Sequence, residues 1–447
     1  MTEVSSSQAP STGQIVKVCL AANVGGWIDY YDFFLSSFVA GTVWPVVFFP
    51  RTIPPPIALS LAVASFAIVY AARPVGAYVF GHLGDKLGRK PALAWTLISM
   101  GLGVLGIGIM PGYAVIGMLA PILVSIFRFI QGLGIGGEFG PSFTWVGEYA
   151  SASKWRTFWV GVGQTVILIG KMTSSAATAI ALAVFSQSDF VSYGWRIPYI
   201  LGAVVAIVGI VIRVRLDESP LFRQMREKRQ VVKFPASDVL KKHWKKSFGL
   251  AVIPLITVGT GVWIQAPYGL VYMDALKVNA AFAALSITIG TAIAVPSTIL
   301  GCILGSIWSK KIVMYIGSVS AILVMFPYFW LIQTLDPLMI ILAQTVFSVT
   351  TYLGASVQMP ILIEQYPTQL RASGSGISIG ITSIYTGIAT GLILPVILAA
   401  TGSVKDAWPE IAAGGVVMLV LVLIATLILK EPERAPLERI WSEKTSQ

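Results

Sequence analysis

The strongest constraint on this 447-residue sequence is a series of twelve apolar runs, each long enough for one helical crossing of a lipid bilayer. A bilayer core about 30 Å thick needs roughly 20 apolar residues per helix. Charged residues make up only 11% of the chain, whereas soluble domains carry roughly 25%. We therefore expect an all-α, polytopic membrane protein. The predicted spans lie near residues 15–40, 58–80, 91–110, 115–144, 157–185, 195–213, 248–273, 280–308, 312–333, 337–363, 373–399 and 411–429.

A long polar segment divides these spans into two sets of six. Two features of the first set recur in the second. Residues 81–90 after the second span are echoed by residues 302–311 after the eighth, and Glu148 and Arg156 recur as Glu364 and Arg371. Repeated halves of this kind are typical of transporters that hold their substrate between the halves near the midplane. The predicted organisation is an N-terminal six-helix half at 1–213, a central loop at 214–247, a C-terminal six-helix half at 248–429 and a tail at 430–447.

Lysine and arginine are distributed unevenly across the predicted membrane plan. Twenty-four of the 31 lie on one side, four lie on the other, and three fall inside spans. Because these residues concentrate in cytoplasmic loops, we expect both termini and the central loop to be cytoplasmic. Residues 1–14 are polar and contain no Lys or Arg, so a cleavable signal peptide is not expected. The sequence predicts a multi-pass protein of the plasma membrane.

The net charge of +11 raises the question of nucleic-acid binding, but eleven of the basic residues lie together at 213–246. A basic segment beside an apolar span is more typical of membrane topology than of a DNA-binding face. Cys19 and Cys302 show no metal-ligand spacing, and neither His82 nor His243 has a second ligand type nearby. We expect no metal, no cofactor and no nucleic-acid partner.

Several motifs resemble those of one transporter family. Residues 81–90 read Gly-His-Leu-Gly-Asp-Lys-Leu-Gly-Arg-Lys, and residues 128–138 read Arg-Phe-Ile-Gln-Gly-Leu-Gly-Ile-Gly-Gly-Glu. Asp-Tyr-Tyr-Asp-Phe-Phe stands at 29–34, Trp-Arg-Ile-Pro at 195–198 and Glu-Ser-Pro-Leu-Phe at 218–222. Over nearly its whole length the sequence resembles the major facilitator superfamily, and within it the metabolite:proton symporter group. The resemblance implies the twelve-helix major facilitator fold in two pseudo-symmetric halves.

The motif at 81–90 is also chemically suited to a gate. Its glycines, at 81, 84 and 88, permit close backbone approach in a tight loop between two helices, and Asp85 can sit at the start of a neighbouring helix or against an arginine. A plain basic loop is the alternative, although it requires neither the glycines nor Asp85. Ser306 replaces this aspartate in the second half, so we expect a weaker latch there. The predicted gating residues are Gly81, Gly84, Asp85, Gly88, Arg89, Lys90, Glu148, Arg156, Glu364 and Arg371.

Charged residues at bilayer depth are functional candidates because they are costly to insert. Asp32 lies 15 residues beyond Lys17, roughly 22 Å into its helix at a rise of 1.5 Å per residue. We expect Asp32 to carry the proton and to exchange it for Arg128, and the resemblance implies the same pair. A static ion pair between two helices is the alternative. Asp29 either shares the proton or pairs with Lys171, and Glu138 is either a relay or a helix-packing partner.

Lys171 is a departure from the family pattern, which usually has an apolar or small residue there. A lysine at cavity depth indicates a site for an anionic substrate, unless it is a structural partner of Asp29. Amide and aromatic side chains can orient a small polar ligand, although each is also compatible with simple packing. The further substrate-binding candidates are Tyr30, Gln164, Gln265, Tyr268, Tyr272, Tyr352, Gln358 and Tyr385.

Together these features predict a proton-coupled symporter that imports a small organic solute by alternating access. The preferred substrate is an organic anion, a mono- or dicarboxylate; the alternative is a proline- or betaine-like osmolyte, or a sugar. A non-transporting sensor would need a sizeable extra domain, and an enzyme would need a nucleophile–base pair or a metal cluster. The expected partners are the solute, protons and the lipid bilayer, with the chain acting as a monomer.

Overall fold

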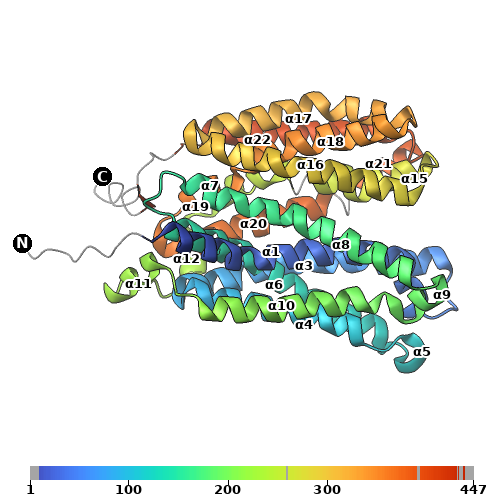
Figure 1. Ribbon diagram of the computed structural model, residues 1–447, viewed down its shortest axis with the longest axis horizontal. Coiled ribbons are helices and arrows are strands. Elements are labelled where there is room, and N and C mark those ends of the chain that lie inside the picture. Colours follow the sequence, from blue (N-terminus) through green and yellow to red (C-terminus); the bar gives the residue numbers. More distant parts are fainter. Residues whose placement is uncertain (1–9, 258–259, 390–392, 430, 432–435, 438–447) are drawn as a thin grey trace, which may run out of the picture.

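The computed structural model describes residues 10–257, 260–389, 393–429, 431 and 436–437, which are helices and their connections without β-strands. The long helices run side by side along the longest axis of the molecule (Figure 1). Most helices of the first half lie together on one side of the bundle, while α16, α17, α18 and α22 lie on the other. The prediction of an all-α protein is confirmed.

The first half contains six long helical segments. The first segment begins at Thr12 and the sixth ends at Arg215. Each of the six starts and finishes within a few residues of the span predicted for it. They are α1 (Thr12–Thr42), α3 (Pro55–Lys86), α4 (Arg89–Ile109), α6 (Leu119–Tyr149), the continuous series α7 (Arg156–Gly161), η1 (Val162–Gln164) and α8 (Thr165–Val184), and α10 (Arg196–Arg215). Short helices between them are α2 (Trp44–Val47), α5 (Tyr113–Ile116), α9 (Gln187–Asp189) and η2 (Phe190–Gly194).

The second half repeats this plan after two short helices, α11 (Pro220–Glu227) and α12 (Pro235–Lys242). The seventh span is built from α13 (Trp244–Leu250), η3 (Ile253–Ile256), η4 (Gly261–Tyr268) and α15 (Gly269–Ala275). The remaining elements are α16 (Ala280–Ile307), α17 (Lys310–Gln333), α18 (Pro337–Ala355), α19 (Gln358–Glu364), η5 (Thr368–Leu370), α20 (Arg371–Ile388), α21 (Leu394–Thr401) and α22 (Trp408–Ile428).

Eight helical segments of the described chain are long and apolar enough to cross a membrane, judged by length and composition. The seventh span differs from a regular helix, because η3 is a 3-10 helix and η4 is a π-helix. Irregular backbone at membrane depth is tolerated where it lies inside the protein or lines a cavity, and π-helical turns are frequent at functional sites. This break places Gln265 on a π-helical turn.

The burial pattern is the reverse of that in a soluble protein. Aliphatic side chains such as Leu323 and Ile428 are 71% and 78% exposed, whereas Asp32 and Arg128 are 2% and 1% exposed. Lipid accommodates the apolar exterior, and the charged groups are kept away from it inside the bundle. The interior charges therefore need partners, and these pairs define the candidate site.

Candidate functional site: a charged central layer and a gate

Asp32 and Arg128 form a buried ion pair between α1 and α6. Arg128 Nη1 lies 3.0 Å from Asp32 Oδ2 and donates a second hydrogen bond to Gln131 Oε1 at 2.8 Å. The other oxygen of Asp32 accepts from Ser36 Oγ at 3.1 Å, and that hydroxyl lies 2.7 Å from Tyr199 Oη. Both oxygens of this carboxylate are thus hydrogen-bonded, and its main charged partner is Arg128.

Asp29 forms a separate pair one helical turn earlier. Its Oδ1 lies 3.3 Å from Arg73 Nη2, on α3. The second oxygen, Oδ2, is buried and has no hydrogen-bond partner among the described residues. The hypothesis that Asp29 pairs with Lys171 is therefore wrong for this conformation, since the adjacent helix α3 supplies an arginine instead. The two carboxylates share a face of α1, as the three-residue spacing requires, but they contact different helices.

Glu138 lies in a third pair, at a different level of α6 from Arg128. It contacts Arg213 on α10, whose Nη1 is 3.1 Å from Glu138 Oε2, and it accepts a hydrogen bond from Thr96 Oγ1 at 2.6 Å. Arg213 also donates to the backbone oxygens of Ala21 and Leu93. These contacts join four helices through one guanidinium group and favour the helix-packing interpretation of Glu138.

A cavity of about 40 Å³ lies where the two halves meet. Four of the substrate-binding candidates line it, namely Tyr30, Lys171, Gln265 and Tyr352. The first half supplies α1 and α8 to its wall, and the second half supplies the broken seventh span, α16 and α18. Its other lining residues are Phe33, Phe34, Thr257, Gly261, Leu270 and Ile287.

Lys171 is the cation that faces this cavity. Its side chain is buried, at 4% exposure, and its ammonium group lies 5.1 Å from the centroid of the Phe34 ring. Within the described part of the chain no carboxylate forms an ion pair with it. Gln265, across the cavity, donates to Gln344 Oε1 at 3.1 Å and to Ser348 Oγ at 3.0 Å, so its amide is held in place. A fixed amide thus faces a lysine that contacts an aromatic ring and no acid.

Two further candidates contact each other across the halves. Gln358 Nε2 on α19 donates to Gln164 Oε1 on η1 at 3.0 Å, and Thr257 Oγ1 donates to Gln358 Oε1 at 3.1 Å. Both amides are fully buried. In this conformation Gln164 and Gln358 join the halves and are absent from the cavity lining.

Three tyrosines predicted to bind substrate lie away from the cavity. Tyr268 and Tyr272 are four residues apart and share a helix face, which packs against Phe329 in the core of the second half. The Tyr268 hydroxyl donates to the Val404 backbone oxygen at 2.8 Å. Tyr385 donates to the Phe248 backbone oxygen at 3.3 Å, at the start of the seventh span. Their prediction as cavity residues is wrong here, because their faces turn toward packing partners.

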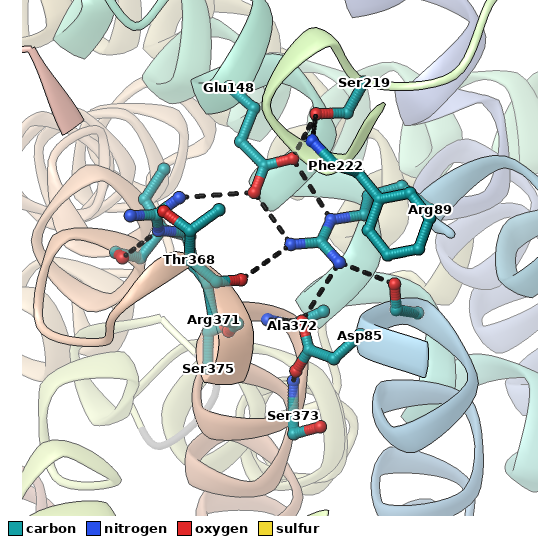
Figure 2. Close-up of polar contacts among 12 residues, drawn as sticks. Asp85, Arg89, Glu148, Ser219, Phe222, Thr368, Arg371, Ala372, Ser373 and Ser375 are labelled. Carbon is teal, nitrogen blue, oxygen red and sulfur yellow. Dashed lines mark hydrogen bonds and ion pairs between the residues drawn. The ribbon is translucent and has the colours of Figure 1, made fainter. Parts of the chain in front are cut away.

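A cluster of buried charges, which we call the latch and whose contacts Figure 2 shows, joins the halves at the end of the bundle predicted to be cytoplasmic. It consists of Asp85, Arg89, Glu148 and Arg371. Asp85 accepts hydrogen bonds from the backbone N–H groups of Ala372 and Ser373, at 3.1 and 2.7 Å. These groups begin α20, where a carboxylate is favoured by the helix dipole. The first half thus caps a helix of the second.

The arginines of the latch share one carboxylate. Arg89 contacts Glu148 through Nε and Nη2, at 3.1 and 2.8 Å, and Arg371 Nη1 lies 3.2 Å from the same carboxylate. Arg89 also donates to the Thr368 backbone oxygen at 2.9 Å. Ser219 donates to Glu148 from the central loop. The latch thus holds α3, α4, α6 and the start of α20 together, and the halves are closed at this end.

The second half has a corresponding cluster. Arg156 Nη2 lies 3.0 Å from Glu364 Oε1, and Lys310 Nζ lies 3.1 Å from Glu364 Oε2. Lys310 occupies the position in the second motif that Arg89 occupies in the first. Ser306, in place of an aspartate, donates to the Cys302 backbone oxygen of its own helix at 2.8 Å. This cluster therefore lacks the helix cap that Asp85 provides.

The three glycines of the motif have two different structural roles. Gly81 and Gly84 lie inside α3 and face α20, where a Cβ at Gly81 would be only 2.9 Å from Ser373 Cα. Gly88 has φ +122° and ψ 160°, a combination that is essentially restricted to glycine. This turn lets the Glu218 carboxylate accept hydrogen bonds from the backbone N–H groups of Arg89 and Lys90, with N to O distances of 3.0 and 3.1 Å. The close contact and the tight turn both depend on the missing side chain.

Some residues of these clusters were not predicted as site residues. Arg73 and Arg213 pair with Asp29 and Glu138, and Lys310 pairs with Glu364. The signal for Lys310 was its place in the internal repeat. Arg73 was visible as a charge within a span, a position that demands a partner. Phe33 and Phe34 adjoin Asp32, but nothing in the sequence distinguishes a cavity-lining phenylalanine from one that faces lipid.

Comparison with known proteins agrees with this architecture. Residues 32–390 match the Major Facilitator Superfamily. The chain is 30% identical to the inner membrane metabolite transport protein YhjE of Escherichia coli (strain K12), covering 82% of this chain and 84% of that protein. It is 26% identical to the shikimate transporter of the same strain, over 94% and 95% of the two chains. It is also 26% identical to the proline/betaine transporter of Salmonella typhimurium (strain LT2), over 95% and 85%.

Among solved structures, the proton:xylose symporter XylE bound to 6-bromo-6-deoxy-D-glucose superimposes with a TM-score of 0.80 at 16% identity, over 97% of this chain and 99% of that chain. The similarity in fold extends over both halves and gives the twelve-helix arrangement. The relatives are transporters rather than enzymes. This chain therefore belongs to the major facilitator superfamily and is a multi-pass membrane transporter of metabolites.

Proposed function

We propose that this protein is a proton-coupled symporter for a small organic anion that carries one carboxylate. The observation that carries the proposal is Lys171, a buried lysine that faces the cavity between the halves and forms no ion pair with any described carboxylate. A desolvated cation needs a counter-charge. A substrate carboxylate supplies one.

The charges around the cavity favour a monoanion over a dianion. Arg73 is paired with Asp29 and Arg128 with Asp32, so their charges are balanced within the protein. Lys171 remains as one positive charge for one negative charge of the substrate. A second carboxylate would need a second cation, and the described lining of the cavity contains no other lysine or arginine.

The remaining lining suits an apolar or hydroxylated body. Tyr30, Phe33, Phe34 and Tyr352 offer aromatic surface, while Gln265 and Thr257 offer hydrogen-bonding groups. A mostly apolar wall with a few fixed polar groups is the usual composition of a small-molecule site. One relative is named for shikimate and another for proline and betaine, and each of these compounds carries one carboxylate. The relatives thus support a common carboxylate contact.

We infer proton coupling from the two aspartate–arginine pairs of α1. Protonation of Asp32 cancels its charge and weakens its contact with Arg128, because the pair depends on Coulomb attraction in a poorly solvated interior. As the halves rock, the carboxylate loses its contact with the arginine and binds a proton instead. Proton binding is thereby linked to the conformation of the protein. Asp29, whose Oδ2 accepts no hydrogen bond from described residues, is a second acceptor for the proton.

A zwitterionic osmolyte is the second candidate. The aromatic rings around the cavity are suited to a quaternary or secondary ammonium group, and the proline/betaine relatives support it. In that case Lys171 still contacts the carboxylate, while Tyr30, Phe33 and Tyr352 contact the ammonium group. The two candidates differ in the charge of the transported molecule.

Counterflow into proteoliposomes containing the purified protein tests these alternatives. We expect a labelled hydroxylated monocarboxylate to be exchanged faster than a dicarboxylate, a betaine or a sugar of similar size. Uptake against a gradient should require an inward proton gradient and stop on addition of a protonophore. Preference for a neutral sugar would contradict the anion site, and concentrative uptake in the presence of the protonophore would contradict proton coupling.

A further inference from the structure

The segment that joins the two halves exposes aromatic and aliphatic side chains at the end of the bundle where the latch lies. Phe234, Leu240, Trp244 and Phe248 are 53%, 42%, 49% and 45% exposed. Phe234 precedes α12, and Trp244 and Phe248 lie on α13, one turn apart, with ring centroids separated by 6.1 Å. Since α13 begins the seventh span, the rings of Trp244 and Phe248 lie in the first turns of a membrane crossing.

Lysines alternate with these apolar side chains. Lys245 lies 5.7 Å from the Trp244 ring centroid, and Lys233 lies 5.4 Å from that of Phe234. Lys241 and Lys242 stand between Leu240 and Trp244 and are exposed. We call these eight residues the basic–aromatic patch; its members are Lys233, Phe234, Leu240, Lys241, Lys242, Trp244, Lys245 and Phe248.

The charge of the whole segment is strongly positive. Residues 213–246 contain eleven Lys and Arg residues but only four Asp and Glu residues. Among the described residues, the acid that contacts the patch is Asp238, whose carboxylate lies 3.6 Å from Lys242 Nζ; both groups are partly solvated. Surface pairs of this kind contribute little, so the patch retains its charge for an external partner.

The patch is held firmly to the transporter. Ser237 Oγ on α12 lies 2.8 Å from Tyr78 Oη on α3. Ser247 Oγ on α13 lies 2.8 Å from the hydroxyl of Tyr366, which lies 3.0 Å from Ser378 Oγ on α20. A partner that binds here meets a preformed surface, and the entropy of ordering a loop is not lost on binding.

We propose that the basic–aromatic patch binds anionic phospholipids of the membrane leaflet that surrounds this end of the bundle. Tryptophan and lysine at the first turn of a span lie at the level of the lipid headgroups. The lysines there are placed to contact lipid phosphate groups, while Leu240, Trp244 and Phe248 contact the glycerol backbone and upper acyl chains. Lipid is favoured over a soluble acidic partner because the exposed rings of Trp244 and Phe248 lie on the helix that begins the seventh span, where aromatic and basic side chains meet the headgroup level of a bilayer.

Native mass spectrometry of the purified full-length chain tests this proposal. The protein is titrated with phosphatidylglycerol and, in parallel, with phosphatidylcholine of the same acyl chains. Each lysine near the headgroups contributes about a fivefold factor in affinity. The combined substitution Lys241→Gln, Lys242→Gln and Lys245→Gln should therefore weaken phosphatidylglycerol binding on the order of 100-fold and leave phosphatidylcholine binding nearly unchanged.

A matched control removes an equal number of positive charges, three, from the neighbouring stretch of the chain. Arg226→Gln, Lys228→Gln and Arg229→Gln change exposed residues that have no exposed aromatic residue within four positions in the sequence, and should change phosphatidylglycerol binding little. Equal losses in the two triple variants would overturn the patch in favour of a general charge effect. If the wild-type chain retained phosphatidylglycerol and phosphatidylcholine equally, the proposal that the patch recognises anionic lipid would be overturned. A soluble partner would then be the better explanation of the surface.

A double variant separates an effect on lipid binding from an effect on folding. Trp244→Ala with Phe248→Ala removes half-exposed rings, so thermal unfolding should be little changed, while retention of phosphatidylglycerol should fall. Retention equal to that of the wild-type chain would show that the rings contribute nothing and would also contradict the proposal.

Discussion

Glu148 and Arg371 form an ion pair at 3.2 Å across the two halves of this protein. The equivalent carboxylate and arginine of the internal repeat, Glu364 and Arg156, pair at 3.0 Å in the opposite sense. Each half therefore contributes the acid of one cluster and the arginine of the other. Separation of the halves at this end must break both pairs together, so the closed state is a cooperative unit rather than a sum of separate contacts.

Removing the charge of Glu148 should open the latch. Glu148→Gln leaves Arg89 and Arg371 buried beside each other without their shared carboxylate, which costs about 3–5 kcal/mol in comparable buried pairs. We expect Ser375→Cys, buried in the closed form, to become reactive toward a membrane-impermeant thiol reagent. The measurement uses a background in which Cys19 and Cys302 are replaced by alanine.

Glu227→Gln is the control for this change, because Glu227 is an exposed acid on α11. It should leave the labelling rate of Ser375→Cys as in the parent. An unchanged rate in Glu148→Gln would show that the latch does not determine which state is populated.

Asp32→Asn should uncouple transport from protons. The amide has nearly the same size, and its oxygen can still accept a hydrogen bond from Arg128, but its NH2 group cannot accept one from Ser36 as Asp32 Oδ1 does. The amide also cannot gain or lose a proton in the physiological range. We expect substrate exchange to persist and accumulation under a pH gradient to be lost. Proteoliposomes with an imposed gradient measure accumulation, and counterflow measures exchange.

The parallel variant Asp29→Asn identifies which carboxylate carries the proton. Accumulation that survives Asp32→Asn but fails in Asp29→Asn would assign the proton to the aspartate whose Oδ2 has no partner among described residues. Survival in both variants would remove the first helix from the coupling mechanism.

Lys171→Gln should weaken binding of a monocarboxylate by roughly 10- to 100-fold, the range expected for loss of a charge-assisted hydrogen bond worth about 1.5–3 kcal/mol. Equilibrium binding by the purified protein provides the measurement. Lys405→Gln, an exposed lysine between α21 and α22, is the control and should have no effect. Equal affinity of Lys171→Gln and wild type would eliminate the anion site.

Gly88→Ala should destabilise the closed protein. The backbone angles at Gly88 are strained for any residue with a Cβ, at a cost of about 1–3 kcal/mol, and that Cβ would lie 2.2 Å from Glu218 Oε2. We expect a lower midpoint of thermal unfolding in detergent. Gly26→Ala, where no neighbouring atom lies within 4 Å, should not lower it; equal behaviour of the two variants would contradict the role of this turn.

The sequence was sufficient for the helical plan because span length and hydropathy are properties of single segments. It also identified Asp32 and Arg128, since a charge at bilayer depth stands out in an apolar run. It could not assign the partner of Asp29. That choice depends on the rotation and depth of three helices, and Arg73 is closer in the fold than Lys171 although both are distant in sequence.

The cavity lining was less predictable than the charges. Gln265, Tyr268 and Tyr272 lie on one span, yet only Gln265 lines the cavity. The π-helical turn at Gly261–Tyr268 shifts the register of the faces, and a regular period of 3.6 residues cannot reproduce that shift. Similarly, the glycines at 81 and 84 were expected in a loop but lie within α3, where they face the opposite half.

The contact between Gly81 and Ser373 has a mechanical consequence. The two helices touch backbone to backbone here, and a single added carbon would come within 2.9 Å of the opposing chain. A bulky residue at this position would clash with the opposing helix only while the two helices are in contact. The same atoms would cause no clash once the helices separate. Tight sealing at this end thus depends on empty volume, and the balance between the two arrangements can be tuned by filling it.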